Sequence, residues 1–542
     1  MRTSFLGGES AHRGFFGGRV SRARVWTIGA ALAFGLLLIL INLVVPGVLA
    51  LLLGIPLAFV LTIDTANGTL VSRQLARYRY WHDHRSGLNV FVPYDQEQWE
   101  LLAETALAAK GRKAKRDAWR EIRGMRAVPS GVEGMDWLRD TQRTAGIQWH
   151  REPGAEEYLA VTFATSGQVS GIESQSYFDA SAAGFGALLG SLGSTLGLAT
   201  RVQSIARVMP MDSTEHQAWV RDHIDEDVPR VLAQSYRQVI SELQRGQLEQ
   251  RNLITVSWPL TPQFLGKAKR RAEGQAGWIR LMDDEIRNLF ARARAAGFQN
   301  VSVLTARQTA AMIRHMQHPG FAADKVADLS PMGGFLPSED SWSFTTYAGA
   351  SEGPDGGVTS SLSRTARIAA GDVETTERNS LWLAPLLTSM PTQVVRSIAF
   401  HQEIVPQEDA RHFAESDIVT DTADSNERAG EGSLTDATID VGKNAALRRW
   451  QDLKPGTGFH GSNWVGYITV TAGDTDGLID ACDAVEAGAA EAGITQLRWL
   501  DTQSAAANAC TWPVGRGIRP AGRASHMKVR SLLTGSGAKE AL

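Results

Sequence analysis

Histidine, cysteine and carboxylate side chains supply most metal ligands and acid–base catalysts, so their spacing gives the first indication of chemistry. His315 and His318 lie three positions apart and can share a helix face, but no third ligand lies near them in the sequence. His82 and His84 likewise have no nearby cysteine or third histidine. We therefore expect no metal site, and we interpret 315–318 as the end of a helix.

Asp283, Asp284 and Glu285 form a run of carboxylates of the kind used in acid–base catalysis. The run lies in an amphipathic pattern that also contains Arg280 and Arg287, so surface ion pairs explain it more simply. The sequence holds no G-x-x-x-x-G-K-[ST] phosphate loop, no H-E-x-x-H and no G-x-S-x-G. We expect no catalytic residue and no bound cofactor, and therefore do not expect an enzyme.

The composition limits the number of domains, the possible partners and the use of disulfides. The chain has 542 residues, 43% of them hydrophobic and 21% charged, enough for two or three packed domains. A formal net charge of -3 argues against a protein that coats nucleic acid over its whole surface, although it leaves room for a local basic patch. Cys482 and Cys510 are too few for a disulfide framework, so we expect free thiols in a reducing compartment.

The element that dominates the sequence is an uncharged run at 25–63. A single helix of that length would rise by about 58 Å, roughly twice the hydrocarbon thickness of a bilayer, so we expect two transmembrane helices, 25–43 and 48–63, that turn near Pro46. A cleaved signal peptide has a much shorter apolar core. Since arginines flank the run on both sides, the positive-inside rule predicts a multi-pass plasma-membrane protein with both termini in the cytoplasm.

Arginines and aromatic residues gather beside this run, in 1–24 and in the segment 64–100. Such residues suit the lipid headgroup layer, because their rings have an apolar body and a polar edge. The expected membrane-interface residues are Arg19, Arg22, Arg24, Arg73, Arg77, Tyr78, Arg79, Tyr80 and Trp81. Next, 101–126 has a helical pattern with a basic run, Lys110, Arg112, Lys113, Lys115, Arg116, Arg120 and Arg123. Such a run is usually a solvated face, and contact with anionic lipid or with a partner's acidic surface is the alternative.

Beyond the hairpin, predicted strands and helices alternate over short distances, which is typical of an α+β fold with a mixed sheet. The pattern predicts a membrane-anchored α+β protein: a cytoplasmic domain at 101–320, an irregular linker at 321–379, a second domain at 380–518 and a flexible tail at 519–542. A closing β-α-β unit near 464–500 indicates ferredoxin-like units. We expect 180–200 to be a soluble, tightly packed helix, with a membrane span as the alternative, and the acidic stretch 416–431 to be mobile.

Four segments, in this order and spacing, carry a resemblance to a known family. They are RYRYWHDHRSG at 77–87, RVQSIARVMPMD at 201–212, the stretch 297–319 and the stretch 466–518. The chain resembles actinobacterial membrane proteins encoded with conjugative and type IV secretion genes, which look like a PrgI-type two-helix subunit fused to the non-ATPase N-terminal part of a VirB-type conjugation ATPase. The tail at 521–542 and the acidic insert near Asp421 depart from that pattern.

The resemblance implies an inner-membrane scaffold or adaptor that docks a separate ATPase at a secretion translocon. The partners it implies are that ATPase, other membrane subunits and the lipid bilayer, in a homo- or hetero-oligomer, without sequence-specific nucleic-acid binding. A type VII secretion membrane subunit and a membrane-anchored enzyme of unknown chemistry are the alternatives.

Overall fold

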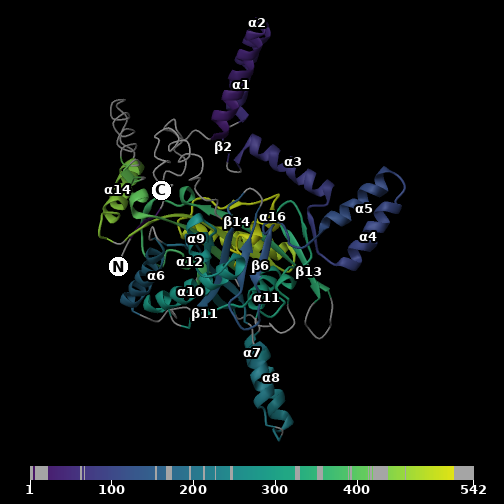
Figure 1. The fold of residues 1–542 in the computed structure, drawn as a ribbon, viewed down its shortest axis with the longest axis vertical. Helices are drawn as coiled ribbons and strands as arrows, with labels where there is room; N and C mark the ends of the chain where they lie inside the picture. The colour runs from purple at the N-terminus through teal and green to yellow at the C-terminus, as the bar shows by residue number, and fades with distance from the viewer. Residues whose placement is uncertain are drawn as a thin grey trace.

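The computed structural model describes residues 4–6 and 22–517 apart from internal gaps, the longest at 7–21, 166–173, 324–329, 351–357 and 419–436. In these residues the largest sheet has 14 strands, in the order β5-β4-β12-β13-β14-β17-β16-β9-β10-β8-β7-β6, with β11 beside β8 and β18 beside β14. Neighbouring strands are antiparallel except for the parallel pair β4 (Val90–Pro93) and β5 (Met125–Arg126). Helices cover the sheet and others project from it (Figure 1).

The first half of the sheet is a β-α-β-β-α-β unit. Its elements are β8 (Tyr158–Thr165), α6 (Gln175–Leu192), β9 (Arg201–Pro210), β10 (Leu248–Pro259), α10 (Gly274–Ala295) and β11 (Ser302–Val303). The β11-β8-β10-β9 strand order is that of a ferredoxin-like unit. Strands β6 (Met135–Arg139) and β7 (Ile147–His150) extend it, α9 (Pro262–Lys269) precedes α10, and α11 (Ala306–Gln317) follows β11.

The second half repeats this order. Its elements are β14 (Val358–Ala369), α12 (Ala384–Leu387), β16 (Val395–Val405), β17 (Gly461–Ala472), α15 (Thr475–Glu491), β18 (Arg498–Trp499) and α16 (Ser504–Ala509), with β12 (Ser338–Asp340) and β13 (Thr345–Ala350) at its outer side. Strands β18-β14-β17-β16 match β11-β8-β10-β9 one for one. The two units meet at β9 and β16, where Arg207 pairs with Ser397, so one sheet runs through both.

Burial explains why the central strands carry little polar and apolar alternation. Six consecutive residues are buried in β8 and six in β17, because both faces of the sheet are covered. One face packs under α6 and α10 in the first unit and under α15 in the second, and the opposite face packs under α11 and Trp512. The residues that follow α16, 510–517, form a run of turns, here called the strap, that contacts β8 and β9 of the first unit.

Three predicted helical stretches can be compared with the structure. The helix end predicted at 315–318 is confirmed, because α11 ends at Gln317, and Thr305 and Gln308 form a reciprocal capping box at its start. Of the uncharged stretch 180–200, residues 180–192 lie in α6, which packs against α10, and the end of α10 brings the Ala296 carbonyl against Gly184. The predicted single helix 101–126 is instead α4 (Gln96–Ala108) and α5 (Arg112–Gly124), broken at Gly111, whose φ is +99°.

The membrane prediction is wrong. The run 25–63 folds as a helical hairpin, α1 (Arg22–Leu40) and α2 (Val44–Leu61), but among the described residues no helix is long and apolar enough to cross a bilayer. The turn comes early, at Asn42 with φ +66°, so the uncharged part of α1 rises by only about 24 Å against the about 30 Å required. The predicted membrane-anchored fold, multi-pass location and cytoplasmic placement of both termini depended on these spans and are wrong for the same reason.

The linker expected at 321–379 is also wrong, because β12, β13 and β14 lie within it and join the main sheet. Gly333 and Gly334 lie in the 3₁₀ turn Pro331–Gly334 before β12, and Gly349 lies within β13, so these glycines do not separate two domains. The stretch 419–436, which contains most of the acidic segment, and the tail 518–542 lie outside the described residues.

Candidate functional site

The residues that are the usual metal ligands and acids have structural partners. His315 Nδ1 lies 2.7 Å from the Phe321 carbonyl and His318 Nε2 lies 2.9 Å from Thr359 Oγ1. Arg139 and Arg271 donate to Asp283 and Asp284 at 2.6 and 2.7 Å. Among the described residues, no three His, Cys, Asp or Glu side chains could hold a metal ion.

The two cysteines are free, as expected. Burial raises the pKa of Cys482 to about 11 and that of Cys510 to about 12. A thiol with so high a pKa has little thiolate at neutral pH and is a poor nucleophile.

The predicted interface residues lie mainly on α3 (Leu70–Ser86). Tyr80 turns inward, with its ring edge-on to Trp342 at 5.1 Å, and so attaches α3 to the β12–β13 connection. Tyr78 and Trp81 face outward with 59% and 54% of their surfaces exposed, and their ring centroids lie 6.4 Å apart. The guanidinium of Arg85 lies 5.0 Å from the Trp81 ring.

Other members of the predicted set are more scattered. Arg77 and Arg79 are exposed on α3. Arg22 and Arg24 begin α1 and Arg73 lies in the first turn of α3, but their side chains are outside what the structure describes, as is the whole of Arg19. The structure therefore brings Tyr78 and Trp81 together on the exposed side of α3, with Arg77 and Arg79 exposed on the same helix and Tyr80 turned inward.

A second candidate surface, which the sequence reasoning missed, is the arm formed by α7 (Thr214–His223) and α8 (Arg230–Gln244). It lies in the β9–β10 connection and projects from the body on the side opposite the α1–α2 hairpin (Figure 1). Val231 and Leu232 are 77% and 62% exposed, and Trp219 and Val239 are also exposed. The α8 sequence carries the signal: apolar residues recur at 231, 232, 236, 239 and 240, one face of a helix.

One side-chain contact joins the two helices of this arm: His216 Nε2 of α7 lies 2.6 Å from the hydroxyl oxygen of Tyr236 of α8. Within α7, the His223 ring stacks on Trp219 at 4.6 Å. The arm is therefore a braced helical hairpin with uncovered apolar side chains, a form that suits helix-mediated protein recognition.

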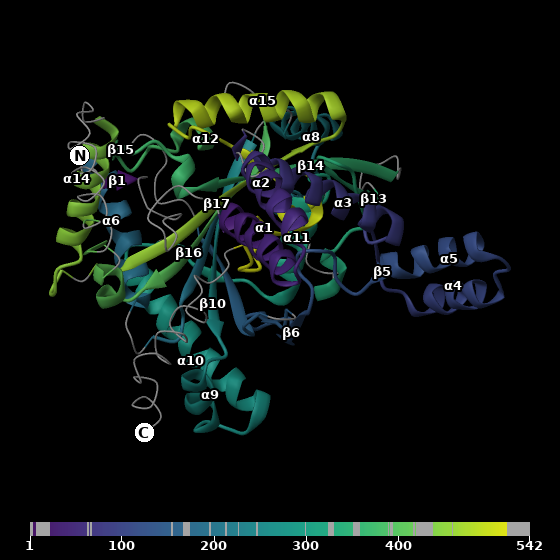
Figure 2. The ribbon, with the colours of Figure 1, turned by 90° about the horizontal axis from the view of Figure 1, so that it is seen from above.

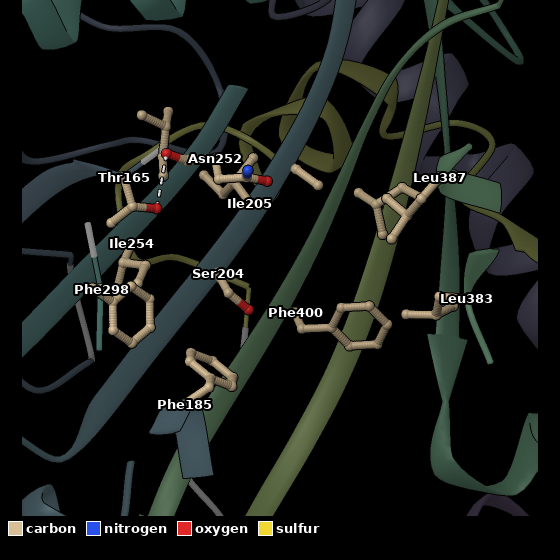
Figure 3. A pocket seen from close by; sticks show the side chains of 13 residues that line it. Thr165, Phe185, Ser204, Ile205, Asn252, Ile254, Phe298, Leu383, Leu387 and Phe400 are labelled. Carbon is tan, nitrogen blue, oxygen red and sulfur yellow. Dashed lines mark hydrogen bonds between the residues drawn. The ribbon is translucent and has the colours of Figure 1, made fainter. Parts of the chain in front are cut away.

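A third feature is an apolar cleft of about 280 Å³ where the two units meet. Its floor is the β10–β9–β16 sheet surface, and aromatic and leucine side chains stand around it (Figure 3). The lining includes Phe185, Phe298, Leu383, Leu387 and Phe400, with Ser204 and Asn252 as polar members. None of the described lining residues is titratable, so the cleft offers apolar contact without acid–base chemistry.

Comparison with known proteins does not assign the chain to a family. No protein-family model matches the chain, and no curated protein matches it. The function must therefore be argued from the surfaces described above.

Proposed function

We propose that this chain is a non-catalytic adaptor subunit of a type IV secretion or conjugation apparatus, and that its α7–α8 arm docks a separate ATPase. The observation that carries the proposal is the arm, which places Trp219, Val231 and Leu232 on a braced hairpin beyond the body of the sheet. Exposed apolar residues that project together are typical of protein recognition sites. The resemblance of the four sequence segments to conjugation proteins supports the choice of partner.

The sequence also supports an adaptor in place of an ATPase. A phosphate loop supplies backbone donors, a lysine and a magnesium-binding hydroxyl together, and no such segment occurs in the chain. The partner is therefore expected to bring the nucleotide site.

The test is capture of the partner from native cells. A photo-crosslinking amino acid at Val231 of the full chain should yield a covalent adduct with an ATPase encoded beside the gene. The double variant Val231→Glu, Leu232→Glu should lose co-purification of that ATPase, because two charges would have to be buried in the interface.

The matched control is Ile479→Glu, which places a charge at a 54% exposed isoleucine of α15, a helix outside the arm. This variant should retain the ATPase. Equal loss in both variants, or crosslinks from Val231 only to unrelated proteins, would contradict the docking role of the arm.

A further inference from the structure

The helices α3 and α5 together form a surface of exposed cations and aromatic rings, distinct from the α7–α8 arm. On α5, Arg112, Lys115, Arg116, Trp119 and Arg123 recur at intervals of three and four residues, so they share one face, and all are exposed. Trp119 is 48% exposed at the centre of that face.

The acidic residues of α5 lie on the other side of the helix. Asp117 and Glu121 are each two positions from Trp119, which puts them nearly opposite its ring. Asp117 meets Arg116 at 3.4 Å. Within the described part of the chain, Arg112, Lys115 and Arg123 have no ion-pair partner. The cations on this face are therefore open to an external anion.

The face continues onto α3. That helix contacts α5, and Gly87, next after its last residue, is packed against the Arg120 backbone of α5. Along α3, Arg77, Tyr78, Trp81 and Arg85 recur at helical spacing on the exposed side, with Arg85 over the Trp81 ring. Figure 2 shows α3 leading towards the α4–α5 hairpin at the edge of the sheet. Rings and cations thus alternate over two adjoining helices.

We propose that this α3–α5 surface binds single-stranded nucleic acid without sequence preference. Guanidinium groups match phosphate oxygens in fork geometry, and exposed tryptophan and tyrosine rings offer faces on which unpaired bases stack. An acidic protein would use the cations but would leave the rings without stacking partners. With a net charge of -3 the chain as a whole has no basic excess, so the attraction for phosphates is expected to come from the local cations of this surface.

The test is fluorescence anisotropy of the full chain with labelled oligo(dT) of about 20 nucleotides, longer than one site of this kind usually covers. The triple variant Arg112→Glu, Lys115→Glu, Arg123→Glu should bind at least about 10-fold more weakly and with a shallower salt dependence, because fewer counterions are released. Trp81→Ala and Trp119→Ala should each weaken binding about 5-fold or more through lost stacking.

The matched control reverses three exposed charges on the other arm, Arg221→Glu, Arg230→Glu and Arg237→Glu, and should bind oligo(dT) as the unaltered chain does. Circular dichroism checks that each variant is folded. Three results would overturn the proposal: equal loss in the control, tryptophan variants that bind normally, or no oligo(dT) binding by a chain that binds polyglutamate or phosphatidylserine vesicles.

Discussion

At the scale of single residues, two histidines buried near the strap have lowered pKa values. His401 Nε2–H donates to the Cys510 carbonyl at 2.7 Å, and burial lowers the pKa of His401 to about 4. His150 stacks on Tyr158 with centroids 4.4 Å apart, and burial lowers its pKa well below the usual value. Both imidazoles are therefore neutral in the folded chain at neutral pH.

The first prediction is a loss of stability in mild acid. Between pH 6.5 and about 4 the unfolded chain takes up a proton at His401 that the folded chain does not, so stability falls as pH falls through that window. The His401 contribution is roughly 3 kcal/mol. Asp340 has the opposite effect on stability over this range, because burial raises its pKa to about 6.

Urea unfolding at several pH values measures this prediction. His401→Gln should lose less stability on acidification than the unaltered chain, and identical pH profiles would refute the assignment.

The second prediction concerns Arg207, which is fully buried at the junction of the units. Its Nη1 donates to Ser397 Oγ at 3.2 Å, while Nε and Nη2 have no partner among the described residues. Since an unpaired buried cation is costly, Arg207→Met should raise the free energy of unfolding by about 1 kcal/mol or more. Arg201 lies on the same strand as Arg207, and Arg201→Met breaks its 3.0 Å contact with Glu156. This variant should lower the free energy of unfolding. A destabilised Arg207→Met variant would contradict the prediction.

At the scale of elements, glycines decide how closely helices approach. Gly184 and Gly186 both lie in α6, but only at the first would an added Cβ meet the backbone of Ala296, while the second faces open space. The same residue type thus has opposite consequences two positions apart.

The third prediction follows from this pair. Gly184→Ala should destabilise the chain by about 1–3 kcal/mol, because α6 must move away from the end of α10. Gly186→Ala should stabilise it by up to about 1 kcal/mol through helix propensity alone. Thermal or urea unfolding measures both, and similar effects at the two positions would contradict the packing argument.

At the scale of the whole molecule, the two units exchange segments. The strap crosses to the first unit, where Gln203 Nε2 donates to the Trp512 carbonyl at 2.8 Å and the Tyr158 hydroxyl to that of Val514 at 3.1 Å. In return, the end of α11 reaches the second unit, where the Ser361 hydroxyl donates to the Gln317 carbonyl at 2.6 Å. Together with the β9–β16 ladder, these contacts couple the units.

The fourth prediction is that the strap stabilises both units at once. Trp512 is almost completely buried against the sheet, so Trp512→Ala should cost about 3–5 kcal/mol. Trp342→Ala, at a tryptophan that is 41% exposed, should cost much less. Hydrogen exchange should show lost protection in β8 and β9 as well as in β17. Loss limited to the second unit would show that the strap does not couple the two.

The sequence by itself determined the elements whose signals are local. α11 begins at the capping box of Thr305 and Gln308, α15 begins after Asp474, whose side chain accepts from the Gly477 N–H, and α10 ends just before Gly297, a residue type that suits the positive φ found there. The 77–81 cluster was also found from sequence, because basic and aromatic residues are contiguous there. Only the tertiary structure decided that β9 pairs with β16 almost two hundred positions away, that 321–379 joins the sheet, and which aromatic residues stay exposed. Strand partners and exposure depend on what packs against each face, and no local pattern specifies a distant neighbour.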